Sequence, residues 1–310
     1  MFNVTVQDLI HCSPTIEVQL SCLFFWTILW TIALPIFVFG IKKFIDSKPW
    51  KEKWLEHNLN AQKKTYKLTF DTRQEGYNFS VLFSAVLFQH ITGGLLTIPA
   101  LFPKIASLLN ISPSMATSLC LHGALCEAGW EVSDTFTRLY QIFLTKDGYK
   151  KNPATLVFLS FLHHMMGLTI TIPMNLSFFD LHWYHEAIFT LQWAAAIALF
   201  LQYYGYTLNL ELSGDLIRMK ISIFISFITI FWTRIFRYIY VAYFIISHIS
   251  LHGSQNMYIG CWVASVSMFL INLLFSMDVA TKLLKFAFMS SKSAKGYQKE
   301  FIEVLKDKHD

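Results

Sequence analysis

Residues 20–41 have the sequence LSCLFFWTILWTIALPIFVFGI, which contains no charged side chain. At about 1.5 Å per residue, a helix of this length crosses a hydrocarbon core about 30 Å thick. A segment in contact with lipid must satisfy its own backbone hydrogen bonds, and a helix does so. This stretch therefore predicts a transmembrane helix.

Apolar stretches of similar length recur along the chain. They lie at residues 79–102, 115–144, 153–173, 187–208, 221–246 and 258–286. Charged residues make up only 15% of the 310 residues, whereas soluble domains carry about 25%. The sequence lacks the short alternating segments that are typical of membrane strands. We therefore predict an all-α fold, a polytopic membrane helical bundle of about seven transmembrane helices.

The distribution of lysine and arginine indicates the orientation of the bundle. With the N-terminus outside, the inner segments hold nine Lys/Arg in residues 42–76, three in 145–152, two in 209–220 and seven after 281, which is 21 of the 25. The outer loops hold only Lys104. Cytoplasmic loops carry an excess of basic residues, and one added or lost span would destroy this asymmetry. We therefore predict the N-terminus outside and the C-terminus inside.

The chain divides into three parts. We expect residues 1–19 to form an N-terminal lead-in, residues 20–286 a seven-helix membrane domain, and residues 287–310 a basic tail on the cytoplasmic side. Within the membrane domain, the polar loop 42–76 forms either an interfacial helix around residues 50–59 or a solvated loop.

The C-terminal tail carries a candidate sorting signal. Its last five residues, Lys306-Asp307-Lys308-His309-Asp310, match the Lys-x-Lys-x-x retrieval pattern of endoplasmic reticulum proteins. The predicted orientation places this tail on the cytoplasmic side, where that pattern is read. We therefore expect an integral protein of the endoplasmic reticulum membrane, with the mitochondrial inner membrane as the alternative.

The third apolar stretch carries four ionisable residues. Glu127, Glu131, Asp134 and Arg138 are spaced by four, three and four. At about 100° per residue, all four lie on one face of a helix. A carboxylate in hydrocarbon costs about 2.5–3.5 kcal/mol, so this face must point into the bundle. We expect both Glu131 and Asp134 to reach Arg138, which neutralises part of the stripe.

Histidines and an arginine reach the same depth from other spans. His163 and His164 are adjacent, about 11 residues from the inner end of their span, which places them about 16 Å deep. His90, Asp134 and Arg234 come to a similar depth. Neighbouring rings on a helix point in different directions, so we expect at most one of the two histidines to face the acids. These residues predict a polar layer near the membrane midplane.

This layer has the composition of an acid–base centre. Asp134 or Glu131 would orient one of the paired histidines and stabilise its positive charge, and the histidine would act as general base or acyl acceptor. Arg234 or Arg237 would hold an anionic headgroup, a phosphate or a thioester oxygen. Intramembrane charges are functional by default, but a structural polar network is the alternative for each residue. For Glu127 and Arg138 we favour the structural role.

No metal ion or other cofactor is expected. The histidines and acids lack the His-x3-His and HxxHH spacings, although their chemistry would suit a metal. The five cysteines form no CxxC pair and are odd in number, which indicates neither a disulfide framework nor a zinc site.

The order of these features resembles the TLC superfamily, which includes the ceramide synthases and the translocating-chain-associated membrane protein. The resemblance rests on Glu131-Val132-Ser133-Asp134, on the pair His163-His164 in the next span, and on Phe231-Trp232-Thr233-Arg234 two spans later. The closing helix, residues 271–285, ends in basic residues as in that family. The resemblance covers roughly residues 79–286.

The resemblance implies a bundle around a lipid-accessible cavity, with the paired histidines and an acid facing it. In ceramide synthases the corresponding groups support acyl transfer from acyl-CoA to a sphingoid amine. This chain has Gly167 where those enzymes carry a threonine, and residues 180–185 lack their His-Asp-x-x-Asp element. Members of the superfamily without that signature are linked to membrane lipid composition.

Three function classes follow from these observations. The first is a lipid protein that binds or modifies acyl chains, with membrane lipids and acyl-CoA as partners and acyl transfer as the reaction. The second is a non-catalytic accessory subunit, bound to the other protein subunits of a larger membrane complex such as a respiratory assembly. The third, prompted only by the span count, is a receptor or channel. We expect no nucleic-acid partner, and whether the chain is an enzyme stays open between the first two classes.

Overall fold

A computed structural model of the chain describes residues 4–66, 68, 70, 72–146, 148–290 and 293. Within these ranges the chain is all-helical and contains no strand, which confirms the all-α part of the prediction. The retrieval pattern at residues 306–310 lies outside the described residues. The helices are α1 (Val6–His11), α2 (Ile16–Asp46), α3 (Lys51–Tyr66), α4 (Arg73–Leu101), α5 (Pro103–Leu108), α6 (Pro113–Leu144), α7 (Gly148–Lys151), α8 (Ala154–Ser177), α9 (His182–Thr207), α10 (Ser213–Phe231), the π-helix η1 (Trp232–Arg237), α11 (Tyr238–His252) and α12 (Gln255–Ala287).

Six helical segments in the described part are long and apolar enough to cross a membrane, so the chain is an integral membrane protein. They are Ile16–Asp46, Arg73–Leu101, Leu156–Ser177, His182–Thr207, Ser213–His252 and Gln255–Ala287. The predicted span at 115–144 corresponds to α6, which forms a helix of 32 residues. Its ionisable stripe and its small side chains make α6 less apolar than the other six, and its crossing of the membrane stays a prediction.

The helix α6 is buried up to Ser133, in contact with α2, α4 and α8, whereas its last turns, from Phe136 on, are largely exposed. Its N-terminus is defined by Ser112, whose hydroxyl accepts a hydrogen bond from the Met115 amide. Small side chains on α6 allow neighbouring backbones to come close, as in other membrane helix pairs. At Gly129, for example, a β-carbon would lie 2.8 Å from backbone atoms of Trp26 and Thr27 in α2. This close packing is why a helix with four ionisable residues can be buried.

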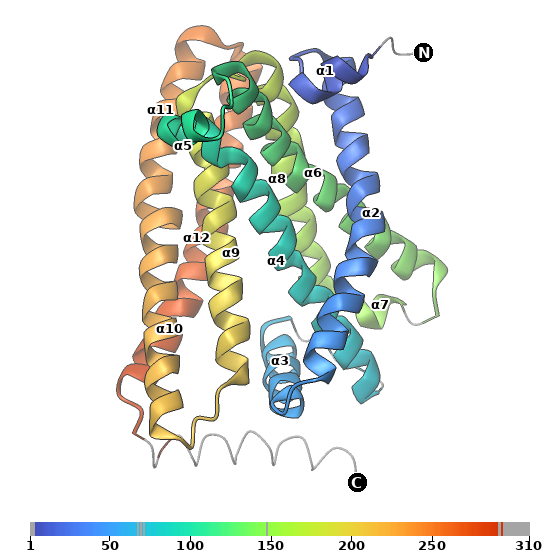
Figure 1. Cartoon of the computed structure of the whole chain (residues 1–310), viewed down its shortest axis with the longest axis vertical. Coiled ribbons are helices and arrows are strands. Elements are labelled where there is room, and N and C mark those ends of the chain that lie inside the picture. Colours follow the sequence, from blue (N-terminus) through green and yellow to red (C-terminus); the bar gives the residue numbers. More distant parts are fainter. Residues whose placement is uncertain are drawn as a thin grey trace.

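The remaining long helices form the other side of the bundle. In Figure 1, α9, α10, α11 and α12 gather on the left, and α2 and α6 lie on the right. Helix α9 contacts both α4 and α10, and so joins the two sides. The predicted span at 221–246 is part of one continuous segment that runs through α10, η1 and α11. A π turn adds a residue to one turn of a helix and often marks a functional site.

The polar loop 42–76 contains a helix, α3, over residues 51–66, and the position of this helix at the membrane interface stays a prediction. Trp54 and Leu55 of α3 are buried, and the helix contacts α4 and α9. At the same end of the bundle, the Tyr77 hydroxyl donates a hydrogen bond of 2.9 Å to Asp46. The short helices α1 and α5 lie at the opposite end (Figure 1).

Candidate functional site

The acids of α6 meet the paired histidines of α8 across a tight helix interface. Glu131 is 1% exposed, and its carboxylate lies against Gly167 of α8. A β-carbon at position 167 would overlap the carboxylate oxygens, so a larger residue there requires the end of the Glu131 side chain to shift. Gly167 therefore has a local structural role, which is to allow a carboxylate to be buried against the histidine helix.

Each histidine contacts a different acid. Nε2 of His163 lies 3.8 Å from Oε1 of Glu131, and Nε2 of His164 lies 3.8 Å from Oδ2 of Asp134. Both rings therefore approach an acid, although we expected at most one to face the acids squarely. Glu131 and Asp134 are nearly one helical turn apart, so two rings that point in different directions each come near a carboxylate. The side chain of His163 is 34% exposed, whereas that of His164 is buried.

A chain of polar contacts positions the second of these pairs. Arg138 donates from Nε to Asp134 over 2.6 Å and from Nη1 to the amide oxygen of Asn152 over 3.3 Å. Nδ1 of His164 lies 3.1 Å from the hydroxyl of Thr135. The predicted contact of Arg138 with Glu131 is not seen among the described residues, because the guanidinium extends toward Asp134 and α7. Arg138 is therefore the ion-pair partner of Asp134, and its purely structural role stays a prediction.

Glu127 and His90 form a second polar group on the other side of Glu131. Oε2 of Glu127 accepts a hydrogen bond of 2.6 Å from Gln89 and lies 3.2 Å from Nδ1 of His90. The same His90 nitrogen lies 3.0 Å from the amide oxygen of Gln192 in α9. One ligand atom each of Glu127, Glu131 and His163 lie within 4.8 Å of one another. His90 is therefore part of the predicted layer, through its contact with Glu127.

The two arginines of η1 have different partners and lie in different surroundings. Arg234 is buried, and donates to the amide oxygen of Asn272 over 3.2 Å and to the backbone oxygen of Leu191 over 2.8 Å. No carboxylate of the described residues lies within ion-pair distance of it. Arg237 instead forms a two-point ion pair with Glu186 at the start of α9. Of the two, only Arg234 belongs to the buried layer.

Sequence reasoning missed the uncharged members of this network. Gln89, Gln192, Asn272 and Asn152 are all buried and hydrogen bond to its charged groups. The first three lie in predicted spans, where an amide side chain is costly unless it has a partner. Amide side chains inside apolar runs are therefore a sequence feature from which these members of the network can be predicted.

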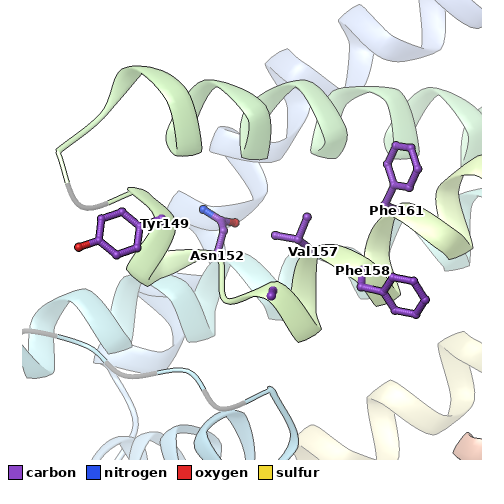
Figure 2. A pocket seen from close by; sticks show the side chains of 6 residues that line it. Tyr149, Asn152, Val157, Phe158 and Phe161 are labelled. Atoms are coloured by element: carbon purple, nitrogen blue, oxygen red, sulfur yellow. The ribbon is translucent and has the colours of Figure 1, made fainter.

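A groove borders the His164 side of the centre. It is open, measures about 560 Å³ and runs along α7 and the first half of α8 (Figure 2). Its lining is almost entirely apolar and consists of Tyr149, Asn152, Ala154, Val157, Phe158 and Phe161. Asn152 connects the groove to Arg138 and Asp134, and His164 follows Phe161 by three residues on the same helix face. His164 does not line the groove, but it lies about one helical turn from Phe161, which does.

A separate cluster lies near α1. Cys12, Cys22 and His122 bring two sulfurs and a ring nitrogen within 4.8 Å of one another, and all five cysteines of the chain are free and buried. Both nitrogens of His122 are already engaged, with the Trp26 indole at 3.2 Å and the backbone oxygen of Leu9 at 2.9 Å. This cluster fastens α1 to α2 and α6.

The chain matches no family model, no curated protein and no solved structure in comparisons with known proteins.

Proposed function

We propose that this chain is a TLC-like integral membrane protein that binds lipid acyl chains and modifies them at the acid–histidine centre between α6 and α8. One observation carries the proposal: His164 contacts Asp134 one helical turn from an apolar groove on the same face of α8. A buried charged group beside an apolar groove is the arrangement expected where a lipid meets a reactive side chain.

The groove would hold the acyl chain. Phe158 and Phe161 are exposed on the flank of a segment long and apolar enough to span the membrane, so an acyl chain can enter from the bilayer without crossing water. Its lining offers little besides apolar surface, which suits a hydrocarbon chain and gives no anchor for a polar one. With the chain in the groove, the polar end of the lipid would face Asn152 or His164.

The histidine next to the groove would act on that polar end. Neutral His164 would accept a proton from an attacking hydroxyl or amine, and Asp134 would stabilise the resulting imidazolium. Arg138 would hold Asp134 in place through the 2.6 Å hydrogen bond. Acyl transfer, with acyl-CoA or another lipid as the donor, is the reaction class that the resemblance implies. In this scheme His163 and Glu131 support the centre from its inner side.

The proposal includes the topology of the bundle. Helix α6 would cross the membrane as the third of seven spans, with the N-terminus outside and the C-terminus on the cytoplasmic side of the endoplasmic reticulum. The placement of 21 of 25 basic residues in alternate loops supports this orientation. So does the fold, because α1 and α5 lie at one end of the bundle and the basic helix α3 lies at the other.

Photo-crosslinking tests the lipid site. The full chain in nanodiscs would be irradiated with a phospholipid that carries a diazirine in its acyl chain, and the labelled peptides would be identified by mass spectrometry. We expect labels to concentrate in residues 148–164. Phe161→Trp should fill the groove and lower the label there several-fold. Phe200→Trp is the matched control, because Phe200 is 57% exposed and Phe161 is 55% exposed.

Two results would count against the lipid site. Labels spread evenly over all lipid-facing helices would show that the groove has no preference for acyl chains. Equal labelling of the Phe161→Trp variant and the control would show that the groove is not where the chain lies. Either result would favour the accessory-subunit alternative, in which the polar layer only holds helices together.

A further inference from the structure

The group formed by Glu127, Glu131 and His163 has the geometry of a metal site. Its three ligand atoms lie within 4.8 Å of one another. Atoms bound to one zinc ion lie within about 4.4 Å of each other, because each bond to the ion is about 2.0–2.2 Å long. Small side-chain rotations would therefore bring all three onto a common ion. The two acids are one helical turn apart on α6, and the histidine comes from α8.

The side chains in this group have unused bonding capacity. Oε2 of Glu131 and Nδ1 of His163 are buried and have no hydrogen-bond partner in the described part of the chain. A buried polar atom without a partner is costly, and a buried carboxylate most of all. The nearest contact of Glu131 with a basic group is the 3.8 Å approach of His163. A bound cation would satisfy the carboxylate and the ring together.

The negative charges of Glu127 and Glu131 are not balanced by the arginines nearby. Two carboxylates this close, shielded from water, repel each other strongly. The neighbouring arginines do not neutralise them. Arg138 pairs with Asp134, and Arg234 hydrogen bonds to Asn272 and a backbone oxygen. The remaining candidates are a proton, held by one of the acids or by His90 beside Glu127, and a divalent ion bound by both acids.

The surrounding residues would orient the ligands. Gln89 donates to Glu127 over 2.6 Å, and His90 lies 3.2 Å from the same oxygen. Gln192 in turn lies 3.0 Å from His90. Hydrogen bonds of this kind fix the direction of metal ligands in known sites. Gly167 completes the arrangement, since a larger residue would displace Glu131.

We propose that Glu127, Glu131 and His163 bind a divalent first-row transition-metal ion in the bundle interior. Carboxylates with one imidazole suit Mn²⁺, Fe²⁺ or Zn²⁺, whereas Mg²⁺ and Ca²⁺ prefer oxygen ligands alone. Three protein ligands leave at least one coordination position open, which is typical of an ion that acts on a substrate. Metal binding at this group does not depend on the lipid function proposed above.

Metal loading of the purified full chain tests the site. Protein in nanodiscs would be stripped with a chelator, loaded with Co²⁺ alone as the probe, washed and analysed for metal content. We expect one Co²⁺ per chain in the wild type. Glu131→Gln and His163→Asn should each lower the affinity at least about tenfold, as loss of a direct ligand exceeds loss of an orienting residue. Cys22→Ser should leave the metal content unchanged, because it alters only the cluster near α1.

A thermal-unfolding control separates loss of the ion from loss of the fold. Co²⁺ should raise the unfolding temperature of the wild type, since an ion that binds only the folded state stabilises it. Co²⁺ should leave the unfolding temperature of the Glu131→Gln variant unchanged, whatever that temperature is without the ion. The proposal fails if the stripped wild type takes up no Co²⁺, which would indicate a bound proton instead. It also fails if Glu131→Gln binds as tightly as the wild type, or if Cys22→Ser removes the ion.

Discussion

Gly167 of α8 lies directly against the carboxylate of Glu131 on α6, with no space between them for a β-carbon. The contact joins the two helices that carry the acids and the paired histidines. It places Glu131 within 3.8 Å of His163 and buries it almost completely. The position of the acid is therefore set by the absence of a side chain on the neighbouring helix.

Replacement of this glycine should disturb both the fold and the centre. Gly167→Ala would force the Glu131 carboxylate away, and overpacking of this kind costs about 1–3 kcal/mol of stability. Gly260→Ala in α12 is the matched control, because a β-carbon there meets nothing within 4 Å. A helical alanine at such an open position should be neutral or stabilise by about 0.5–1 kcal/mol. Denaturant titration in detergent gives both values. Equal effects at the two positions would show that the close contact is absent.

The ion pair of Asp134 with Arg138 should show strong coupling. Both side chains are largely buried, so Asp134→Asn would leave the guanidinium without its carboxylate and cost roughly 3 kcal/mol. Arg138→Gln in the Asp134→Asn background should recover much of that loss, since the unpaired charge is then removed. A double-mutant cycle of unfolding free energies measures the coupling. Additive effects of the two substitutions would contradict the pairing.

Acidification should loosen α3. The pKa of His57 in this helix is lowered from its ordinary value of 6.5 to about 4, first by burial and second by the nearby charge of Lys53, against a hydrogen bond with the Tyr206 backbone that raises it. The unfolded helix therefore takes up a proton more readily than the folded one. Stability of α3 should be constant above pH 6.5 and fall by roughly 1–3 kcal/mol as the pH drops from 6.5 toward 4.

Hydrogen exchange of residues 51–66, corrected for the intrinsic rate at each pH, measures this opening. Exchange should accelerate over that pH range in the wild type. A His57→Gln variant has no ring to protonate, so its corrected exchange should change much less. A wild-type profile as flat as that of the variant would show that His57 does not control the docking of α3.

Labelling from one side of the membrane tests whether α6 crosses it. Ser107→Cys before α6 and Lys146→Cys after it introduce exposed thiols, whereas the native cysteines are buried. In sealed vesicles of known orientation, a membrane-impermeant maleimide should label the first from outside and the second only after permeabilisation. The unmodified chain serves as the background control. Labelling of both positions from the same side would reduce the bundle to six spans and reverse the predicted orientation of every segment after α6.

The sequence predicts the helices well, because an apolar run of about 20 residues can adopt few structures other than a membrane-spanning helix. Each predicted span lies on a described helix or, for 221–246, on the longer continuous segment Ser213–His252 that runs through α10, η1 and α11. The differences lie at the ends, where caps such as Ser112 and Ser254 start a helix before the apolar run begins. Whether α6 crosses the membrane is harder to predict. Its charged face can be buried only through contacts with neighbouring helices, which the sequence does not show.

The site could be predicted only in part. The stripe on α6 and the pair His163–His164 are visible as ionisable residues in apolar runs, and the structure brings them together. Arg237 departs from the layer because a π turn holds more residues than an α turn, so residues three apart diverge further. The position of Glu127 beside Glu131 and His163 depends on the approach of α8 at Gly167. A tertiary contact of this kind cannot be inferred from the spacing of residues along the sequence.

A density map of the full chain in nanodiscs tests the central claim most directly. The claim is that the groove along α8 holds an acyl chain whose polar end reaches the centre between α6 and α8. We predict continuous acyl density beside Phe158 and Phe161 that ends within hydrogen-bond reach of His164 or Asn152. A groove closed by packed side chains, or occupied by the helix of another protein subunit, would contradict the claim.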